Sequence, residues 1–312
     1  MIKYNYFQLY YQMKFLRMVE EKLVELHPEQ NMRTPFHLYI GQEAIAVGVC
    51  ENLSKFDLVF SNHRSHGHYL AKGGDINKFF SEMYNKNNGC SSGRGGSMHL
   101  IDTECGHMGS SSIMAGTIPI SVGAALTMKM KNRKNASVCF FGDGAVDEGV
   151  LYESLNFASL NKLNVIFVCE NNKLSVNTPI HLRRPKDNLT EIAKSFGVSS
   201  QRLNGNDVLK VFKQVNDIRK IQKKIPQPFL IECDTYRFKD HIGINDAKNF
   251  KDIKKFCPIK KLENTLLKQK KINYKKIKTI ENSINKIINK ANIHGKKSML
   301  PNKNNLLKYV YA

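Results

Sequence analysis

One stretch near the middle of the chain constrains the fold more than any other. An apolar run, Val138–Phe141, leads directly into a Gly-Asp-Gly turn centred on Asp143. A helical pattern follows over about 147–160, and then a second apolar run, 165–169, ends in a polar turn at Asn172. Short apolar runs bounded by turn residues are typical of buried strands. This order predicts a βαβ unit whose functional side chains lie at the carboxyl ends of its strands.

Asp143 and Asn172 have the chemistry of a magnesium site. A carboxylate oxygen and an amide oxygen, completed by phosphate oxygens and water, suit the octahedral coordination of Mg²⁺. Gly142 and Gly144 let the backbone approach a phosphate group closely, and the N-terminus of the next helix favours an anion there. A lone Gly-Asp-Gly is an ordinary turn. Followed after 26 residues by Asn-Asn, however, it resembles the thiamine diphosphate signature.

Length and composition narrow the class of protein. The 312 residues can form a large core, and no apolar run approaches the roughly 18 residues of a membrane span. The N-terminus has the pattern of an amphipathic helix over 3–27 and not of a signal peptide. Seven scattered cysteines without a Cys-x-x-Cys pair favour reduced thiols and a cytoplasmic location. We predict two parts, an α/β domain over 1–250 and a Lys-rich helical arm over 251–312.

The net charge of +21 is concentrated in that arm. Residues 251–312 hold 17 lysines and only three acidic residues, without interleaved aromatic residues or a nucleic-acid-binding motif. We interpret the arm as a solvated basic surface and predict no nucleic-acid site. Docking of an acidic partner protein is the alternative.

The remaining periodicity predicts alternating strands and helices. The predicted helices are 42–53, 69–86, 119–131, 189–196 and 207–223, and the further predicted strands are 57–60, 198–203 and 229–235. Residues 87–119 are rich in Gly and Ser but contain large apolar residues such as Met98 and Met114. A loop this long in a compact chain is usually functional, so we predict an ordered loop that wraps a ligand.

Several motifs occur in the order and spacing of one family: HLYIGQEA, NHRSHGHYLAKGG, GCSSGRGGSMHL, GSSSIMAGTIP, FFGDGAVDEG, VCENN, GNDV and TYRFKDHIG. They resemble the alpha subunit of the thiamine diphosphate-dependent, decarboxylating first component of 2-oxo acid dehydrogenase complexes. The resemblance is densest over about 15–241. It implies a three-layer α/β thiamine diphosphate-binding fold with a mostly parallel central sheet, and here a helical C-terminal extension.

The resemblance also implies roles for individual residues. The expected Mg²⁺ ligands are the side chains of Asp143 and Asn172 and the backbone carbonyl of Leu174, where many members have Tyr. The implied cofactor-binding residues are Arg64, Ser112, Met114, Gly142, Asp143, Gly144, Ala145, Asn172, Leu174 and His241. The implied catalytic residues are His241 and His63, the latter at a position where many members have Tyr. His37, His66, His68 and His99 are candidates for the substrate channel.

Two regions depart from the family pattern. The run GINDAKNF after His241 differs from the usual phosphorylatable serine loop, which argues against kinase control of the eukaryotic kind. Glu153 matches a carboxylate of the acidic tunnel that links paired active sites. The position that accompanies it in some members is occupied by Val150 here, which argues against the tunnel.

The resemblance implies a partner chain, because no motif in this sequence supplies the Glu that the cofactor's pyrimidine ring requires. In the family a beta subunit provides it within an α₂β₂ tetramer that works with a lipoyl acyltransferase core. The expected substrate is a 2-oxo acid, with pyruvate first and branched-chain 2-oxo acids or acetoin as competitors. Two other hypotheses are a transketolase-like or acyloin-forming enzyme of a biosynthetic pathway and a scaffold without catalytic activity.

Overall fold

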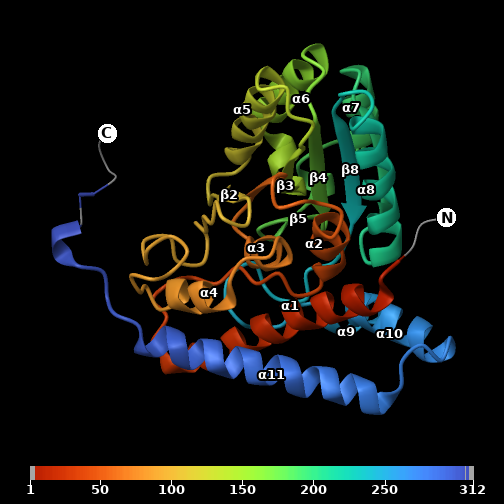
Figure 1. The fold of residues 1–312 in the computed structure, drawn as a ribbon. Coiled ribbons are helices and arrows are strands. Elements are labelled where there is room, and N and C mark those ends of the chain that lie inside the picture. The colour runs from red at the N-terminus through yellow and green to blue at the C-terminus, as the bar shows by residue number, and fades with distance from the viewer. Residues whose placement is uncertain (1–3, 306, 309–312) are drawn as a thin grey trace.

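The computed structural model describes residues 4–305, 307 and 308. Within them, a six-stranded parallel sheet runs in the order β2-β1-β3-β4-β8-β7 (Figure 1). Its strands are β1 (Leu58–Ser61), β2 (His107–Ser110), β3 (Ser137–Gly142), β4 (Val165–Asn171), β7 (Ser199–Asn204) and β8 (Phe229–Asp234). A separate antiparallel pair is formed by β5 (Leu174–Ser175) and β6 (Thr178–Pro179).

Helices cover both faces of the sheet and one of its ends (Figure 1). They are α1 (Tyr6–Leu26), α2 (Glu43–Cys50), α3 (His66–Ala71), α4 (Ile76–Met83), α5 (Thr117–Met130), α6 (Gly149–Leu160), α7 (Leu189–Ser195), α8 (Val208–Gln222), α9 (Phe250–Ile253), α10 (Pro258–Lys268) and α11 (Tyr274–Lys297). The short 3-10 helices are η1 (His27–Glu29), η2 (Asp143–Asp147), η3 (Ile180–Leu182), η4 (Lys254–Phe256) and η5 (Lys303–Asn305).

The central strands are apolar on both faces, which is why they read as continuous apolar runs. Side chains alternate along a strand, so Val138 and Phe140 of β3 face one way and Cys139 and Phe141 the other. The first pair packs with α2 and α8, and the second pair packs with α5, α6 and α7. The result is the predicted three-layer α/β architecture around a parallel sheet, which is therefore confirmed.

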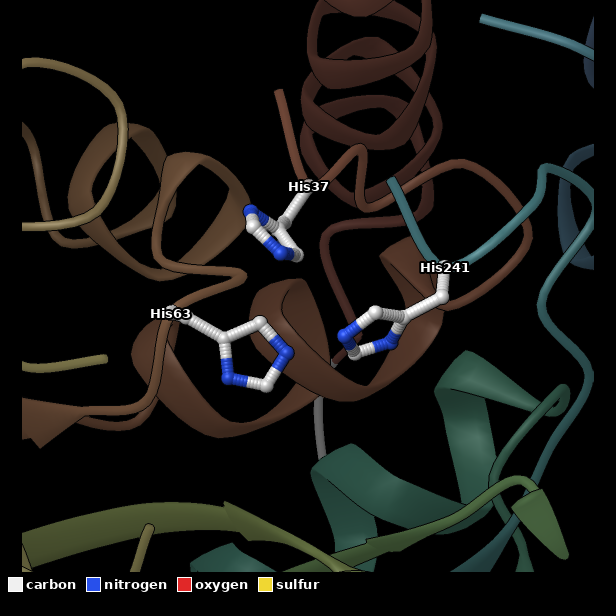
Figure 2. A group of neighbouring side chains, drawn as sticks. All are labelled: His37, His63 and His241. Atoms are coloured by element: carbon white, nitrogen blue, oxygen red, sulfur yellow. The ribbon is translucent and has the colours of Figure 1, made fainter. Parts of the chain in front are cut away.

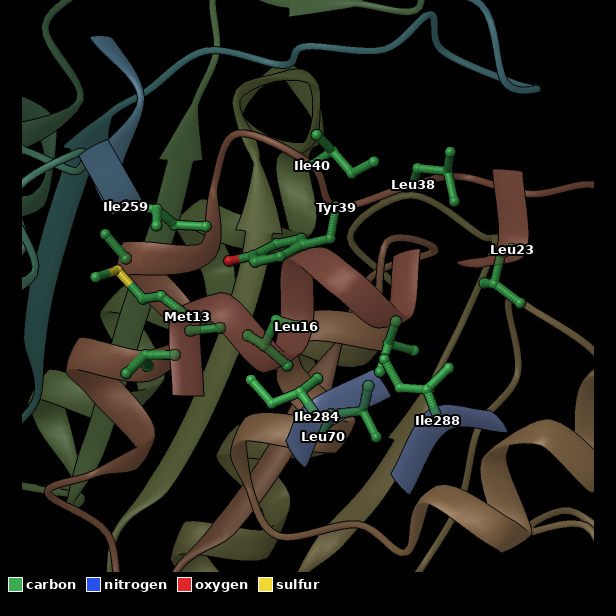
Figure 3. Close-up of a cluster of buried hydrophobic side chains, with 14 of the residues drawn as sticks. Met13, Leu16, Leu23, Leu38, Tyr39, Ile40, Leu70, Ile259, Ile284 and Ile288 are labelled. Atoms are coloured by element: carbon green, nitrogen blue, oxygen red, sulfur yellow. The ribbon is translucent and has the colours of Figure 1, made fainter. Parts of the chain in front are cut away.

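The N-terminal and C-terminal helices form a helical body at the end of the sheet, below it in Figure 1. Met13 and Leu16 of α1 share one buried apolar cluster with Ile259 of α10 and with Ile284 and Ile288 of α11 (Figure 3). The lysines of α11 lie mainly on its outer face, because its buried positions recur every three to four residues. The predicted helical C-terminal extension is thus confirmed. The predicted domain boundary at residue 250 stays a prediction.

Two predicted segments differ from the structure. Residues 69–86 do not form one helix, because Gly73 adopts a positive φ of 95° and separates α3 from α4. Asp75 then caps α4 by accepting hydrogen bonds from the backbone N–H groups of Asn77 and Lys78. The predicted loop 87–119 includes β2, an edge strand too short and too polar to stand out in the sequence.

One buried carboxylate organises the glycine-rich part of that loop. Glu82, at the end of α4, accepts hydrogen bonds of 2.8–3.0 Å from four backbone N–H groups, those of Ser91, Gly93, Gly95 and Gly96. Because a buried carboxylate needs several donors, the loop folds around Glu82. The loop is therefore ordered, and the prediction that it wraps a ligand stays a prediction.

In the part of the chain that the structure describes, no helix is long and apolar enough to cross a membrane.

Candidate functional site

The carboxyl ends of β3 and β4 border a cavity of about 230 Å³. Gly142 and Glu170 are register partners on these strands, so Asp143 and Asn172 follow at the same edge of the sheet. Ten of the predicted site residues line this cavity: His63, Arg64, Ser112, Met114, Gly142, Asp143, Gly144, Asn172, Leu174 and His241. Ala145 is buried in η2 and is not among the lining residues. The structure thus brings together residues from five separate parts of the sequence, and the roles predicted for them stay predictions.

Asp143 has the features of a metal ligand. Its side chain is almost fully buried, and its Oδ2 accepts a hydrogen bond from Arg183 Nη2. Its Oδ1 has no hydrogen-bond partner. Burial raises the pKa of Asp143, and Arg183 and Arg184 oppose that shift. A buried carboxylate oxygen without a donor is costly unless a cation satisfies it, so the cavity fits Mg²⁺ at this position.

Asn172 presents its amide in a fixed orientation. Its Nδ2 donates to Gln42 Oε1 at 3.1 Å, and its Oδ1 accepts from the backbone N–H of Leu174 at 3.2 Å. An amide oxygen can accept twice, which leaves one lone pair for a metal. Leu174 starts the short β5–β6 hairpin and also lines the cavity. The predicted ligand set is therefore compatible with the local backbone.

The turn at Gly144 leaves no room for a side chain. A Cβ atom there would lie 2.7 Å from Ser175 Oγ, 3.1 Å from Ser175 Cβ and 3.4 Å from Met114 Cε. The neighbouring Gly142 has open space around the same position. Residue 144 is thus restricted to glycine by contacts within the chain, with Ser175 and Met114. The absence of a side chain also leaves the backbone of this turn accessible from the cavity.

Two arginines create the positive charge of the cavity. Arg64 is held by the carbonyls of Leu38 and His241 at 2.9 and 3.0 Å, and its Nη2 lies 3.1 Å from His241 Nδ1. Arg237 donates to the Val176 carbonyl at 2.9 Å, and its Nη1 lies 3.2 Å from the same Nδ1. Burial, with a contribution from Arg237, lowers the pKa of Arg64 to about 9. Adjacent guanidinium groups favour a polyanion such as a diphosphate.

Three imidazole rings that line the cavity, those of His37, His63 and His241, converge on one another (Figure 2). His37 and His63 lie 4.7 Å apart between ring centroids, and His241 lies 5.1 and 5.4 Å from them. Burial and the Arg64 charge lower the pKa of His37 to about 3, of His63 to about 2 and of His241 to about 4. All three rings are therefore neutral at pH 7. One nitrogen from each ring lies within 4.8 Å of the others, a spacing that could hold a metal ion. However, two guanidinium groups donate to His241 Nδ1, so the proton of this ring is on Nε2. Their positive charge also disfavours a cation among the three rings.

The other candidate channel histidines lie elsewhere. His68 is fully buried and contacts Glu170 at 2.9 Å, and His66 is fully buried between Glu20 and Ser97 at 2.7 Å from each. Both are core residues. His99 Nε2 lies 3.3 Å from the Ser112 hydroxyl, and His99 itself does not line the cavity. Only His37 of the four lines the cavity. Glu153, the candidate tunnel residue, is exposed on α6.

Several lining or contacting residues were not predicted from the sequence. Glu170 borders the cavity and is fixed by the Tyr39 hydroxyl, His68 and, at 3.4 Å, Asn62. Arg183 and Arg184 reach Asp143 from the loop after β4. Glu170 offered one signal, an acidic residue at the end of an otherwise apolar strand. The two arginines offered none, because adjacent cations in a polar loop usually mark a solvated surface.

Comparison with known proteins agrees with this geometry. The sequence profile described as "Dehydrogenase E1 component" matches residues 11–303. The alpha subunit of acetoin:2,6-dichlorophenolindophenol oxidoreductase from Bacillus subtilis is 36% identical over 311 residues, covering 97% of this chain and 92% of the relative. The pyruvate dehydrogenase E1 alpha subunit from Rickettsia bellii is 30% identical, covering 100% and 97%. The chloroplastic pyruvate dehydrogenase E1 alpha-3 subunit from Arabidopsis thaliana is 32% identical, covering 98% and 74%.

Proposed function

Since this chain belongs to the dehydrogenase E1 component family, we propose that it is the alpha subunit of a 2-oxo acid dehydrogenase that depends on thiamine diphosphate and Mg²⁺. The proposed reaction is the oxidative decarboxylation of a 2-oxo acid, with pyruvate first, and transfer of the acyl group to a lipoyl group. The observation that carries this proposal is the unpartnered Asp143 Oδ1 at the strand edge that also holds Asn172, Arg64 and His241.

Each part of the cavity has a distinct task in this proposal. Asp143, Asn172 and the Leu174 carbonyl hold the metal, and Arg64 with His241 binds the diphosphate. Ser112 and Met114 line the cavity, and we propose that their backbone contacts the aminopyrimidine ring. When bound, thiamine diphosphate supplies the electron sink that decarboxylation requires.

The chain's own side chains orient the reactants by hydrogen bonds. His63 and His241 are neutral at pH 7, because burial and the Arg64 charge lower their pKa values to about 2 and about 4. Each neutral ring carries one donor and one acceptor nitrogen, so it can form hydrogen bonds without adding charge to the cavity. His241 Nδ1 accepts hydrogen bonds from Arg64 and Arg237, so Nε2 carries the proton that a bound anion would meet. We assign the catalytic contributions of this chain to His63 and His241 on that basis.

The proposal includes a partner. The matched relatives are named as alpha subunits, and we propose that this chain joins a beta subunit in an α₂β₂ tetramer that supplies the missing Glu. A lipoyl acyltransferase core is the proposed acceptor of the acyl group. All seven cysteines are free thiols, which is consistent with the proposed location in the reducing cytoplasm.

The test is an assay of the chain alone and with its beta subunit. With thiamine diphosphate, Mg²⁺, pyruvate and 2,6-dichlorophenolindophenol, the purified chain alone should show no turnover, and the coexpressed pair should reduce the dye. Turnover by the isolated chain would contradict the shared active site. Failure of the pair on pyruvate and on branched-chain 2-oxo acids would contradict the proposed substrate class.

Acetoin is the second candidate substrate. It is favoured by the 36% identity to a subunit of acetoin:2,6-dichlorophenolindophenol oxidoreductase. The same assay separates the two candidates, because reduction of the dye with acetoin and not with pyruvate would assign the second function.

A further inference from the structure

The loop between β4 and α7 carries two arginines that converge on Asp143. Arg183 Nη2 donates to Asp143 Oδ2, and its Nη1 lies 3.3 Å from the Asp143 carbonyl oxygen. Arg184 Nη1 reaches the same carbonyl at 3.2 Å. Both arginine side chains are nearly buried, with 10% and 12% exposure.

We infer that Arg183 is a positioning residue, which holds one oxygen of the Asp143 carboxylate and thereby aims the other at the metal. Oδ2 is taken by the guanidinium group, and Oδ1 is buried without a partner. A carboxylate fixed in this way can bind a metal through one oxygen only. The inference rests on the proposed function, because it concerns the same Mg²⁺ site.

A nearby acidic residue makes this arrangement compatible with a bound cation. Asp147 pairs with Arg183 and, at 3.4 Å, with Arg184. The two guanidinium groups are therefore balanced by the two carboxylates of Asp143 and Asp147. Neighbouring carboxylates reduce the repulsion between the two guanidinium groups and a cation. The arginine pair therefore does not exclude a divalent cation at Asp143 Oδ1.

The same loop also supplies the third predicted metal ligand. Leu174 begins the hairpin, and a backbone hydrogen bond of 3.1 Å from Ile180 to the Lys173 carbonyl closes its base. Arg183 follows directly after η3. The far end of the loop is fixed separately by Asp187, which pairs with Lys173 at 2.6 Å and with Arg202 at 2.8 Å. Arg183 thus links the loop to Asp143, and Arg202 anchors the loop without contacting Asp143.

Measurement of Mn²⁺ binding tests the inference. The full chain, coexpressed and purified with its beta subunit, is titrated with Mn²⁺ in the presence of thiamine diphosphate, and bound metal is followed by electron paramagnetic resonance. We expect the dissociation constant for Mn²⁺ to rise at least tenfold in Arg183→Ala. The value for Arg183→Lys should lie between those of Arg183→Ala and the unsubstituted protein. The matched control Arg202→Gln should stay within twofold of the unsubstituted protein. Circular dichroism verifies that each variant is folded.

Chemical rescue separates positioning from a general structural role. Millimolar methylguanidinium should restore part of the Mn²⁺ affinity of Arg183→Ala, but it should not change that of Arg202→Gln. Unchanged or tighter binding by Arg183→Ala would overturn the inference alone, and tighter binding would identify the guanidinium as a competitor of the metal. Absence of Mn²⁺ binding by the unsubstituted complex would instead contradict the proposed function, and the inference with it.

Discussion

The hydroxyl of Tyr39 donates a hydrogen bond to the carboxylate of Glu170, which joins the loop before α2 to the end of the central strand β4. Both residues are almost fully buried. Tyr39 packs in the apolar cluster that includes α1 and α11, and Glu170 lines the cavity, so this contact connects that cluster with the proposed cofactor site. A hydrogen bond to a buried charged group contributes more than a neutral one.

Replacement of Tyr39 by Phe should therefore destabilise the protein. We expect the free energy of unfolding to fall by about 2 kcal/mol, because Glu170 loses one of its donors. Urea denaturation followed by circular dichroism measures the change. Tyr152→Phe is the matched control, since the Tyr152 hydroxyl donates to a neutral backbone carbonyl, that of Val146, at 2.6 Å. Its cost should be about 1 kcal/mol, and equal costs would contradict a special role for the Glu170 contact.

Replacement of Gly144 by Ala should weaken cofactor binding. The new methyl group would lie 2.7 Å from Ser175 Oγ, so either the hairpin or the turn at the metal site must move. We expect the concentration of thiamine diphosphate that half-saturates the complex to rise about tenfold or more, which corresponds to about 1.4 kcal/mol. Gly149→Ala, where a methyl group meets open space, serves as the control. Equal saturation curves for both variants would show that the turn tolerates a side chain.

Replacement of His107 by Leu should reduce the dependence of stability on pH. His107 is fully buried, neither ring nitrogen has a hydrogen-bond partner, and burial lowers its pKa to about 3. The unfolded chain, with a pKa of about 6.5, binds the proton first, so stability falls as pH falls from about 6.5 towards 3. This residue alone should lower the free energy of unfolding by about 2 kcal/mol between pH 7 and pH 5.

Thermal unfolding at these two pH values, for His107→Leu and for the unsubstituted chain, measures that contribution. His181→Leu is a suitable control, because His181 is exposed. If His107→Leu and the unsubstituted chain lose the same stability on acidification, then His107 does not titrate as its burial implies.

Replacement of Ile284 by Ala should test whether the C-terminal helices unfold with the rest of the protein. Ile284 of α11 is fully buried in the apolar cluster that it shares with α1, so truncation should cost about 2–5 kcal/mol. If one cooperative unit exists, the single unfolding transition shifts as a whole. If residues 251–312 form a separate unit, a second, earlier transition appears. Ile287→Ala, at a position 40% exposed on the same helix, should change stability much less.

The sequence predicted the parts of the site that follow from strand ends. Asp143 and Asn172 each lie in the turn that ends an apolar run, and parallel strands place their carboxyl ends at one edge. The layered fold was predictable for the same reason, since β3 and β4 are buried on both faces. The turn at Gly73 was not predicted, because a glycine within a helical pattern does not by itself indicate a positive φ.

The contacts made by side chains distant in sequence were not predictable in this way. Arg183 lies 40 residues after Asp143 in a loop of mixed charge, and only the folded loop shows which carboxylate it meets. Arg237 lies within a motif of the family, yet its contact with His241 depends on the turn between them. His66 and His68 share a motif with Arg64, and burial separates them from the cavity.

The buried carboxylate of Glu82 has a consequence for how this protein can vary. Surface loops normally accept insertions and deletions at little cost. The loop from Ser91 to Gly96 has a fixed length instead, because four of its amide groups must converge on one side chain. Adding or removing a single residue there would misalign the donors and leave a charge unsolvated. Engineered tags or fused domains therefore belong elsewhere on the molecule, although this segment resembles a flexible linker in composition.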